Sequence, residues 1–232
     1  MVVRAVLLDR DGIINDLVYY PEHGIVDSPF VPEQFRLMAG VGPALRRFKE
    51  LDYLLIVVSN QPGIAKGHFD AKTFEEIRLT MQKNLRNFGV ELDGEYYCLH
   101  HPFAKRPEYG LDCECRKPKP GLLIQAARDH KISLEDSFMI GDGLVDVQAG
   151  KAAGCTTILV ASMNSLLSRL MIEQKAEPDF VARTLPEAVT ILETRSQSTA
   201  GQCDTDGVIN EVDHFPGVGV ARPLTWRNCF MV

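Results

Sequence analysis

The sequence lacks an excess of basic residues, a long apolar run and any internal repeat. Its 25 lysine and arginine residues are outnumbered by 31 aspartate and glutamate residues, which gives a net charge of −6. General binding to nucleic acids or membrane surfaces needs a broad basic face, so this balance argues against both classes. No apolar run approaches the roughly 20 residues of a membrane helix, and Asp9 interrupts the first apolar run too early for a signal peptide. We therefore expect a cytoplasmic protein with no nucleic-acid partner and no membrane partner.

The composition is that of an ordinary globular protein. The chain has 232 residues, of which 45% are hydrophobic and 24% are charged, and this suffices for one sizeable domain with a full core. We expect this domain to span residues 1–194. Beyond it the sequence turns polar and aperiodic, so residues 195–232 are predicted to be a linker and a tail without a clear period.

Short apolar runs alternate with amphipathic segments along most of the chain. Apolar runs without polar alternation are typical of parallel strands that are buried on both faces. The pattern predicts strands at residues 3–8, 53–59, 95–99, 138–140, 156–161 and 179–182, and helices at residues 42–51, 71–88, 120–130, 144–153, 164–174 and 185–193. We therefore predict a doubly wound, three-layer α/β/α fold without a large cap domain, with ligands bound beyond the carboxyl ends of the strands.

Cysteine and histidine are concentrated between residues 98 and 115. Cys98 and His100 form one Cys-x-His pair, and Cys113 and Cys115 form a Cys-x-Cys pair. Two such pairs across a loop complete the tetrahedral set that Zn²⁺ prefers, and a site filled by four protein ligands has a structural role. His101 is a competing ligand, although the matching one-residue spacing favours His100. A Cys98–Cys113 disulfide, which a reducing compartment disfavours, and unliganded thiols are the alternatives.

Acidic residues follow two of the predicted strands. Asp9 and Asp11 can face the same side of an extended chain, and Gly12 then permits a sharp turn. Asp142 follows the fourth predicted strand, with Asp146 one helical turn further on. Neighbouring carboxylates repel each other unless a cation lies between them, and Mg²⁺ suits such a site because it keeps water and phosphate ligands. A polar turn and an acid-rich helix N-terminus are the alternatives.

Hydrogen-bond donors follow the second strand and precede a helix. Ser59, Asn60 and Gln61 place a hydroxyl and two amides at the same edge of the predicted sheet, although a turn or an N-cap would explain them alone. Arg116 and Lys117 supply cations before the helix at residues 120–130, where a solvated basic loop is the alternative.

Four motifs occur in order and with compatible spacing: DRDGIIN at residues 9–15, SNQPGIAKG at residues 59–67, CECRKPKPG at residues 113–121 and MIGDGLVDVQAG at residues 139–150. Together they resemble the haloacid dehalogenase-like phosphohydrolase superfamily. The residues of these motifs are most similar to those of the heptose bisphosphate phosphatases, with the histidinol-phosphate phosphatases as near relatives. The resemblance covers residues 3–192.

The resemblance implies a role for each acidic residue. Asp9 would be the nucleophile that forms an aspartyl-phosphate, and Asp11 the general acid and then the general base. Mg²⁺ would be held by the Asp9 carboxylate, the Asp11 backbone carbonyl and Asp142. Asp146 would orient water molecules on the metal.

The resemblance also implies roles for the donors. Ser59 and Lys117 would donate to the transferring phosphoryl oxygens, and Arg116 would grip the substrate. Asn60 and Gln61 would line the phosphate end of the pocket. The implied zinc ligands are the four residues described above.

The implied substrate is a small sugar phosphate. It would be D-glycero-D-manno-heptose 1,7-bisphosphate, converted to heptose 1-phosphate during synthesis of surface (lipopolysaccharide) heptose precursors by a monomeric enzyme. Residues 16–35 should lie over the site, with His23 and Gly24 near the sugar. Gly143 stands where many relatives carry lysine, which weakens the assignment of the sugar. Histidinol phosphate, another small phosphomonoester, or a non-catalytic zinc-stabilised binding module are the alternatives.

Overall fold

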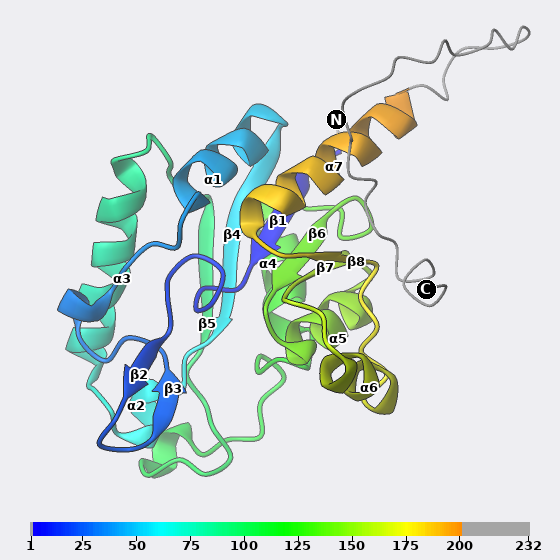
Figure 1. The fold of residues 1–232 in the computed structure, drawn as a ribbon. Coiled ribbons are helices and arrows are strands. Elements are labelled where there is room, and N and C mark those ends of the chain that lie inside the picture. The colour runs from blue at the N-terminus through cyan, green and yellow to red at the C-terminus, as the bar shows by residue number, and fades with distance from the viewer. Residues whose placement is uncertain (1, 201–232) are drawn as a thin grey trace, which may run out of the picture.

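The computed structural model describes residues 2–200, which form a three-layer α/β/α sandwich (Figure 1). In this part of the chain, six parallel strands form a sheet in the order β5-β4-β1-β6-β7-β8, and two short strands form a hairpin. The strands are β1 (Arg4–Leu8), β2 (Val18–Tyr20), β3 (Ile25–Asp27), β4 (Tyr53–Asn60), β5 (Gly94–Cys98), β6 (Phe138–Gly141), β7 (Thr156–Val160) and β8 (Phe180–Ala182). The helices are α1 (Val41–Glu50), α2 (Gly63–Lys66), α3 (Ala71–Arg86), α4 (Gly121–His130), α5 (Leu144–Ala153), α6 (Ser165–Glu173) and α7 (Leu185–Ala200). The predicted doubly wound α/β fold is confirmed.

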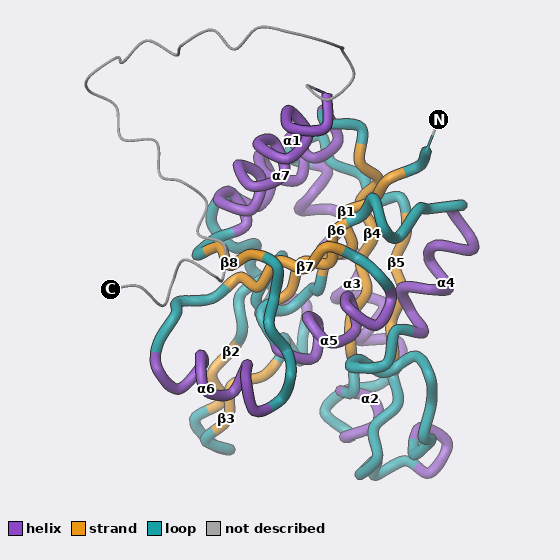
Figure 2. The backbone as a smooth tube through the Cα atoms, turned by 90° about the vertical axis from the view of Figure 1, so that its right-hand side faces the viewer, coloured by secondary structure: helices purple, strands orange, loops and turns teal. Residues whose placement is uncertain are grey.

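Side chains of the central strand β1 alternate between two separate cores. Val6 and Leu8 pack beneath α1, α3 and α7, whereas Ala5 and Leu7 face α4 and α5. All four are 0% exposed, which explains why β1 is a continuous apolar run. In Figure 2, α1 and α7 lie side by side over one face of the sheet.

The beginning of α3 agrees with the sequence pattern. The Asp70 carboxylate accepts a hydrogen bond of 2.8 Å from the N–H of Thr73, so Asp70 is the predicted N-cap. The helix ends at Arg86, two residues before the predicted end, and Gly89 follows with a φ of 69°. Each helix within the described residues is too short or too polar to cross a lipid bilayer.

Helix α7 extends into the predicted linker. This helix runs from Leu185 to Ala200, beyond the predicted domain end. The Arg195 guanidinium lies over the rings of Phe138 and Phe180, which ties the last turns to the sheet. The added turns contain neither glycine nor proline to end the helix. Residues 195–200 of the predicted linker are thus helical, and residues 201–232 of the predicted tail lie outside the described residues.

The hairpin of β2 and β3 lies beside α2 in Figure 1, within the segment expected to cover the site. Asp27 pairs with Lys66 at 3.3 Å, and the ring of Phe30 stacks on Tyr20 and His68 at centroid distances of 4.0 Å and 4.3 Å. The pattern did not predict this hairpin or α2, because strands of three residues are too short to show a period.

Candidate active site

The order of the strands brings the predicted carboxylates together. β4, β1 and β6 are neighbours, so their carboxyl ends place Ser59, Asp9 and Asp142 along one edge of the sheet. Carboxylate oxygens of Asp9, Asp142 and Asp146 lie within 4.8 Å of one another. Asp146 reaches this group from the first turn of α5, as its spacing from Asp142 predicts.

Two glycines allow these carboxylates to approach the backbone. A Cβ atom at Gly12 would lie 2.0 Å from Asp142 Oδ2, and one at Gly141 would lie 2.2 Å from Asp146 Oδ2. Gly12 also has a φ of 79°, which other residues rarely adopt. The positions of both carboxylates therefore depend on glycine.

The three carboxylates of the site carry more negative charge than the adjacent Lys117 can balance. Loss of hydration is the largest cause that raises the pKa of Asp142 to about 7, and repulsion from the charges of Asp9 and Asp146 is the next. Asp142 is partly exposed, so solvent screens part of the repulsion. Burial raises the pKa of Asp146 to about 6, against the attraction of Lys117. Oxygen donors are the ligands that Mg²⁺ prefers, and a divalent cation would relieve the repulsion. The group therefore fits Mg²⁺.

Lys117 is enclosed beside the predicted nucleophile. Its side chain is 1% exposed, and its Nζ lies 3.0 Å from Asp9 Oδ1 and 2.5 Å from Asp146 Oδ1. It also donates to the carbonyl oxygen of Val58 at 2.8 Å. Burial lowers the pKa of Lys117, but the two carboxylates outweigh burial and raise this pKa above its usual value. Lys117 is thus a fixed cation that joins Asp9 to Asp146.

The polar residues at the end of β4 contact other predicted site residues. Asn60 exchanges two hydrogen bonds of 3.0 Å with the backbone of Lys117. Gln61 Nε2 donates to Asp11 Oδ2 at 2.5 Å and to Ser59 Oγ at 3.1 Å. Ser59 and Gln61 are both buried. These contacts fix the two amides against the site instead of leaving them exposed at its mouth.

The Asp11 side chain points into a pocket of donors. Its carboxylate accepts from Arg10 Nη2 at 3.1 Å and from Asn15 Nδ2 at 2.9 Å, in addition to Gln61. This orientation is compatible with the expectation that Asp11 offers a metal its backbone carbonyl. Sequence reasoning assigned no role to Arg10 or Asn15. A charged residue between two aspartates, directly after an apolar strand, is the signal that could have identified Arg10.

The four predicted zinc ligands converge. The Sγ atoms of Cys98 and Cys113 lie 3.6 Å apart, those of Cys113 and Cys115 lie 3.2 Å apart, and His100 Nδ1 is 3.4 Å from Cys115 Sγ. Zinc with tetrahedral bonds of about 2.0–2.3 Å separates its ligands by about 3.5–3.8 Å. Burial raises the pKa of Cys98 and of Cys115, so a bound cation would be needed to hold them as thiolates at neutral pH. The set fits a closed zinc site.

Two alternatives, a disulfide and a ligand role for His101, are disfavoured. Cys98 and Cys113 are free thiols whose sulfurs are too far apart for the bond of about 2.05 Å in a disulfide. His101 lies outside the ligand group, and its Nδ1 accepts the N–H of Phe103 at 3.1 Å.

The other predicted substrate-binding residues, Arg116, His23 and Gly24, are not part of the carboxylate group. Arg116 Nη1 donates to the carbonyl of His100 at 3.1 Å, which links this guanidinium to the zinc loop. His23 and Gly24 are exposed at the turn of the β2–β3 hairpin.

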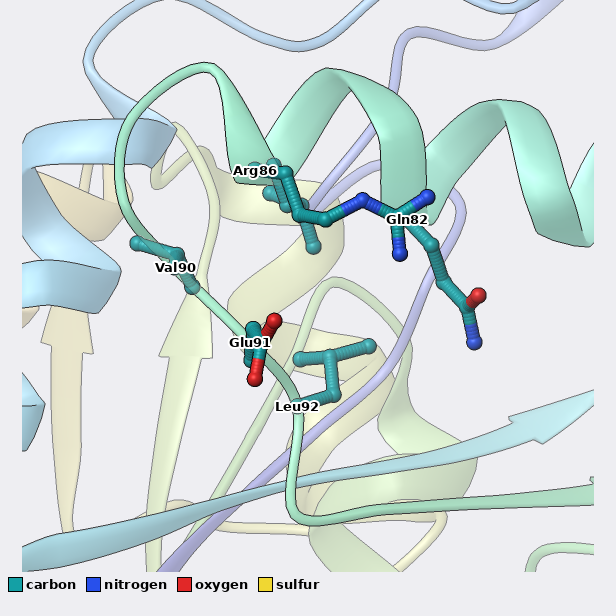
Figure 3. A pocket seen from close by; sticks show the side chains of 6 residues that line it. Gln82, Arg86, Val90, Glu91 and Leu92 are labelled. Carbon is teal, nitrogen blue, oxygen red and sulfur yellow. The ribbon is translucent and has the colours of Figure 1, made fainter.

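A cavity elsewhere on the surface is separate from this site. It measures about 260 Å³ and is lined by Gln82, Leu85 and Arg86 of α3 and by Val90, Glu91 and Leu92 (Figure 3). The last three residues lead into the amino end of β5, whereas the carboxylates lie at the opposite edge. The cavity therefore has no part in the proposed chemistry.

The chain is similar to known phosphatases over most of its described length. The family model "HAD-hyrolase-like" matches residues 114–188. The curated D-glycero-beta-D-manno-heptose-1,7-bisphosphate 7-phosphatase of Yersinia pestis is 37% identical over 194 residues, which are 83% of this chain and 97% of the relative. The protein of the same name from Escherichia coli K12 is 41% identical over 155 residues, 67% of this chain and 77% of the relative.

A solved structure supports the same relationship. The D,D-heptose 1.7-bisphosphate phosphatase from B. bronchiseptica, complexed with magnesium and phosphate, has a TM-score of 0.66 at 28% identity. The alignment covers 83% of this chain and 99% of that chain. The chain belongs to the D-glycero-beta-D-manno-heptose-1,7-bisphosphate 7-phosphatase family of haloacid dehalogenase-like phosphatases.

Proposed function

We propose that the protein is a Mg²⁺-dependent phosphatase that converts D-glycero-D-manno-heptose 1,7-bisphosphate to heptose 1-phosphate. The observation that carries the chemistry is the buried Lys117, which contacts Asp9 and Asp146 within a group of three carboxylates. The heptose bisphosphate is the substrate that the names of the curated relatives give, and it is favoured over histidinol phosphate for that reason.

The first half of the reaction transfers phosphate to Asp9. Two donors, Lys117 Nζ and the N–H of Arg10, act on Asp9 Oδ1 and fix the rotation of the carboxylate. In this proposal Asp9 Oδ2 attacks phosphorus, an O–P bond forms, and the bond from phosphorus to the sugar oxygen breaks. Asp11 gives its proton to the departing sugar oxygen.

The second half returns the enzyme to its starting state. Asp11, now a carboxylate, accepts a proton from a water molecule whose oxygen attacks phosphorus. The bond between Asp9 and phosphorus breaks, and inorganic phosphate leaves. Mg²⁺, held by the Asp9 carboxylate, the Asp11 carbonyl and Asp142, would offset the repulsion between the nucleophile and the phosphate.

The remaining residues bind and orient. Ser59 donates to the phosphoryl oxygens, and such a donor is worth about 3 kcal/mol in the transition state. The three N–H groups of Lys117 contact Asp9, Asp146 and the Val58 carbonyl, so Lys117 reaches the expected phosphoryl donor role only by exchanging one of these contacts, and otherwise acts on the phosphoryl group through its charge. Gln61 orients Ser59 and Asp11, while Asn60 holds the backbone of Lys117. Asp146 holds the ammonium of Lys117 as well as facing the metal position.

The remaining predicted residues contact the sugar or bind zinc. Arg116, with His23 and Gly24 on the hairpin, contacts the sugar or its second phosphate. Zn²⁺ bound by Cys98, His100, Cys113 and Cys115 has a structural role, and these thiol ligands suit a reducing, cytoplasmic enzyme, which we take to be a monomer.

Phosphate release from a panel of substrates tests the proposal. The panel contains the heptose bisphosphate, its 1-phosphate, other sugar phosphates and histidinol phosphate, each with and without Mg²⁺. We expect kcat/KM for the bisphosphate to exceed the others by about tenfold or more, which corresponds to about 1.4 kcal/mol of transition-state binding. Equal, weak rates on every compound would contradict the heptose assignment, whereas no release from any would contradict the phosphatase itself.

A further inference from the structure

Arg10 is a fully buried cation between the two aspartates of the first motif. It is 0% exposed and is among the largest fully buried side chains of the described residues. Burying a charge is costly unless it is paired and hydrogen-bonded. The partner that the structure supplies is Asp11, whose side chain is 14% exposed.

The contact between Arg10 and Asp11 involves two guanidinium nitrogens and both carboxylate oxygens. Nε lies 3.3 Å from Oδ1, and Nη2 lies 3.1 Å from Oδ1 and 3.2 Å from Oδ2. Planar contacts of this kind restrict the rotation of a carboxyl group. Asn15 and Gln61 complete the set, but both are neutral, so Arg10 is the cation that contacts Asp11.

The backbone of Arg10 holds the same loop in place. Its N–H donates to Asp9 Oδ1 at 2.8 Å, and its carbonyl accepts from the N–H of Ile14 at 2.7 Å and of Asn15 at 3.2 Å. One residue therefore connects the nucleophile, the acid and the turn that follows them.

Stability alone gives no reason for a cation at this position. Arg10 Nη1 is buried without a hydrogen-bond partner among the described residues. Unpaired buried donors are uncommon because each costs free energy, and an apolar side chain of similar size would avoid that cost. The guanidinium is thus explained by what it does to Asp11.

We infer that Arg10 is a positioning residue that sets the Asp11 carboxyl group for proton transfer to the departing sugar oxygen. It acts through Asp11 and does not touch the substrate. The inference rests on the proposed function, because it assumes that Asp11 is the general acid and base.

The dependence of the rate on the leaving group separates this role from a structural one. A sugar alkoxide is a poor leaving group and needs a proton, whereas p-nitrophenolate leaves without one. Misplacing Asp11 should slow the second half of the reaction equally for both substrates, because both form the same aspartyl-phosphate. In the first half, it should slow release of the sugar far more than release of p-nitrophenolate, so the two leaving groups are compared in single-turnover measurements of that step. A general loss of structure would slow both to the same extent.

The experiment compares Arg10→Met and Arg10→Lys with the wild-type protein on both substrates. For Arg10→Met we expect the single-turnover rate of sugar release to fall about 100-fold, the lower end of what general acid catalysis contributes. We expect the single-turnover rate of p-nitrophenolate release to change less than about threefold. Arg10→Lys keeps the charge and should recover part of the loss. Arg78→Met, which breaks ion pairs with Glu75 and Glu95 on α3 and β5, is the control and should leave the ratio of the two rates unchanged.

A double-mutant cycle gives a second, independent measure. In an Asp11→Asn background, Arg10→Met should cause no further loss on the sugar phosphate, because the group it positions is already gone. Equal losses on both substrates, or the same loss in both backgrounds, would overturn the inference. If Arg10→Met does not fold, the ratio of the two rates in Arg10→Lys decides, and an unchanged ratio would again overturn it. A wild-type protein that releases phosphate from neither substrate would instead overturn the proposed function together with the inference.

Discussion

Replacing Lys117 by methionine removes the cation from a buried group of carboxylates while keeping an apolar stem of similar length. Asp146, whose side chain is 2% exposed, then has no cation at 2.5 Å. Breaking a buried ion pair in this way typically costs about 3–5 kcal/mol. The variant can avoid this cost by protonating Asp146, which removes the unpaired charge.

The cost of protonating Asp146 sets an upper limit to the loss of stability, and this limit depends on pH. A carboxyl with an ordinary pKa of 3.8 costs about 4 kcal/mol to protonate at pH 7, and about 1.4 kcal/mol less for each unit that the pH falls. A carboxyl group whose pKa is raised on folding destabilises the protein when the pH lies above the pKa that the group has in the unfolded chain. Below that pKa the group is protonated in both states, and the penalty disappears. The pKa of Asp146 is already about 6 beside Lys117, so the wild type itself bears about 3 kcal/mol of this penalty at pH 7. We therefore expect Lys117→Met to lower the free energy of unfolding by about 1–2 kcal/mol at pH 7, by more at pH 8, and by almost nothing at pH 5.

Urea unfolding of both proteins in magnesium-free buffer, from pH 5 to pH 8, measures this difference. Lys119→Met is the matched control, because Lys119 is 37% exposed and pairs with the exposed Asp112 and Glu114. It should change stability by less than about 1 kcal/mol at every pH. A loss of under about 1 kcal/mol in Lys117→Met at pH 7, or a loss independent of pH, would refute the assignment of Lys117 as the compensating charge.

Three other predictions follow from the site. Asp9→Asn should abolish phosphate release while the far-ultraviolet circular dichroism and the unfolding midpoint stay near those of the wild type; near-normal turnover would exclude the aspartyl-phosphate route. Metal analysis should find about one zinc per chain. Cys115→Ala should lose the zinc and raise KM, because Arg116 follows Cys115 directly and contacts the His100 carbonyl. Folded, active protein free of zinc would contradict a structural zinc. Mg²⁺ affinity, measured by calorimetry, should rise from pH 5 to pH 8. Asp142, whose pKa is about 7, must lose its proton to bind the metal, and Asp146, whose pKa is about 6, must lose its proton to orient water on the metal. Affinity that stays level with pH would mean that Asp142 is not a ligand.

Agreement between the sequence and the structure is best where a pattern is long and local. The apolar run at residues 53–59 predicts β4 to within one residue, because a buried strand needs apolar side chains on both faces. The Cys-x-His and Cys-x-Cys spacing predicts the four residues that converge in the zinc loop. The pattern fails where local signals are weak, as in the three-residue strands of the hairpin. It also misses the continuation of α7 past residue 193, where Arg195 lies over the rings of Phe138 and Phe180 from distant strands.

The sequence by itself determined which chemical groups the site contains. Because parallel strands end at a common edge, aspartates placed after two apolar runs had to approach one another, and the motifs identified the family. The tertiary structure alone decided which groups pair. Lys117 was expected to meet phosphate, but its burial also places it between Asp9 and Asp146, and Arg10 was given no role until its contact with Asp11 was visible. The contacts of Lys117 join segments far apart in the chain. Arg10 and Asp11 are neighbours, but their side chains meet only because the fold buries the guanidinium and excludes water around it. A local pattern of residues shows neither the distant contact nor the burial.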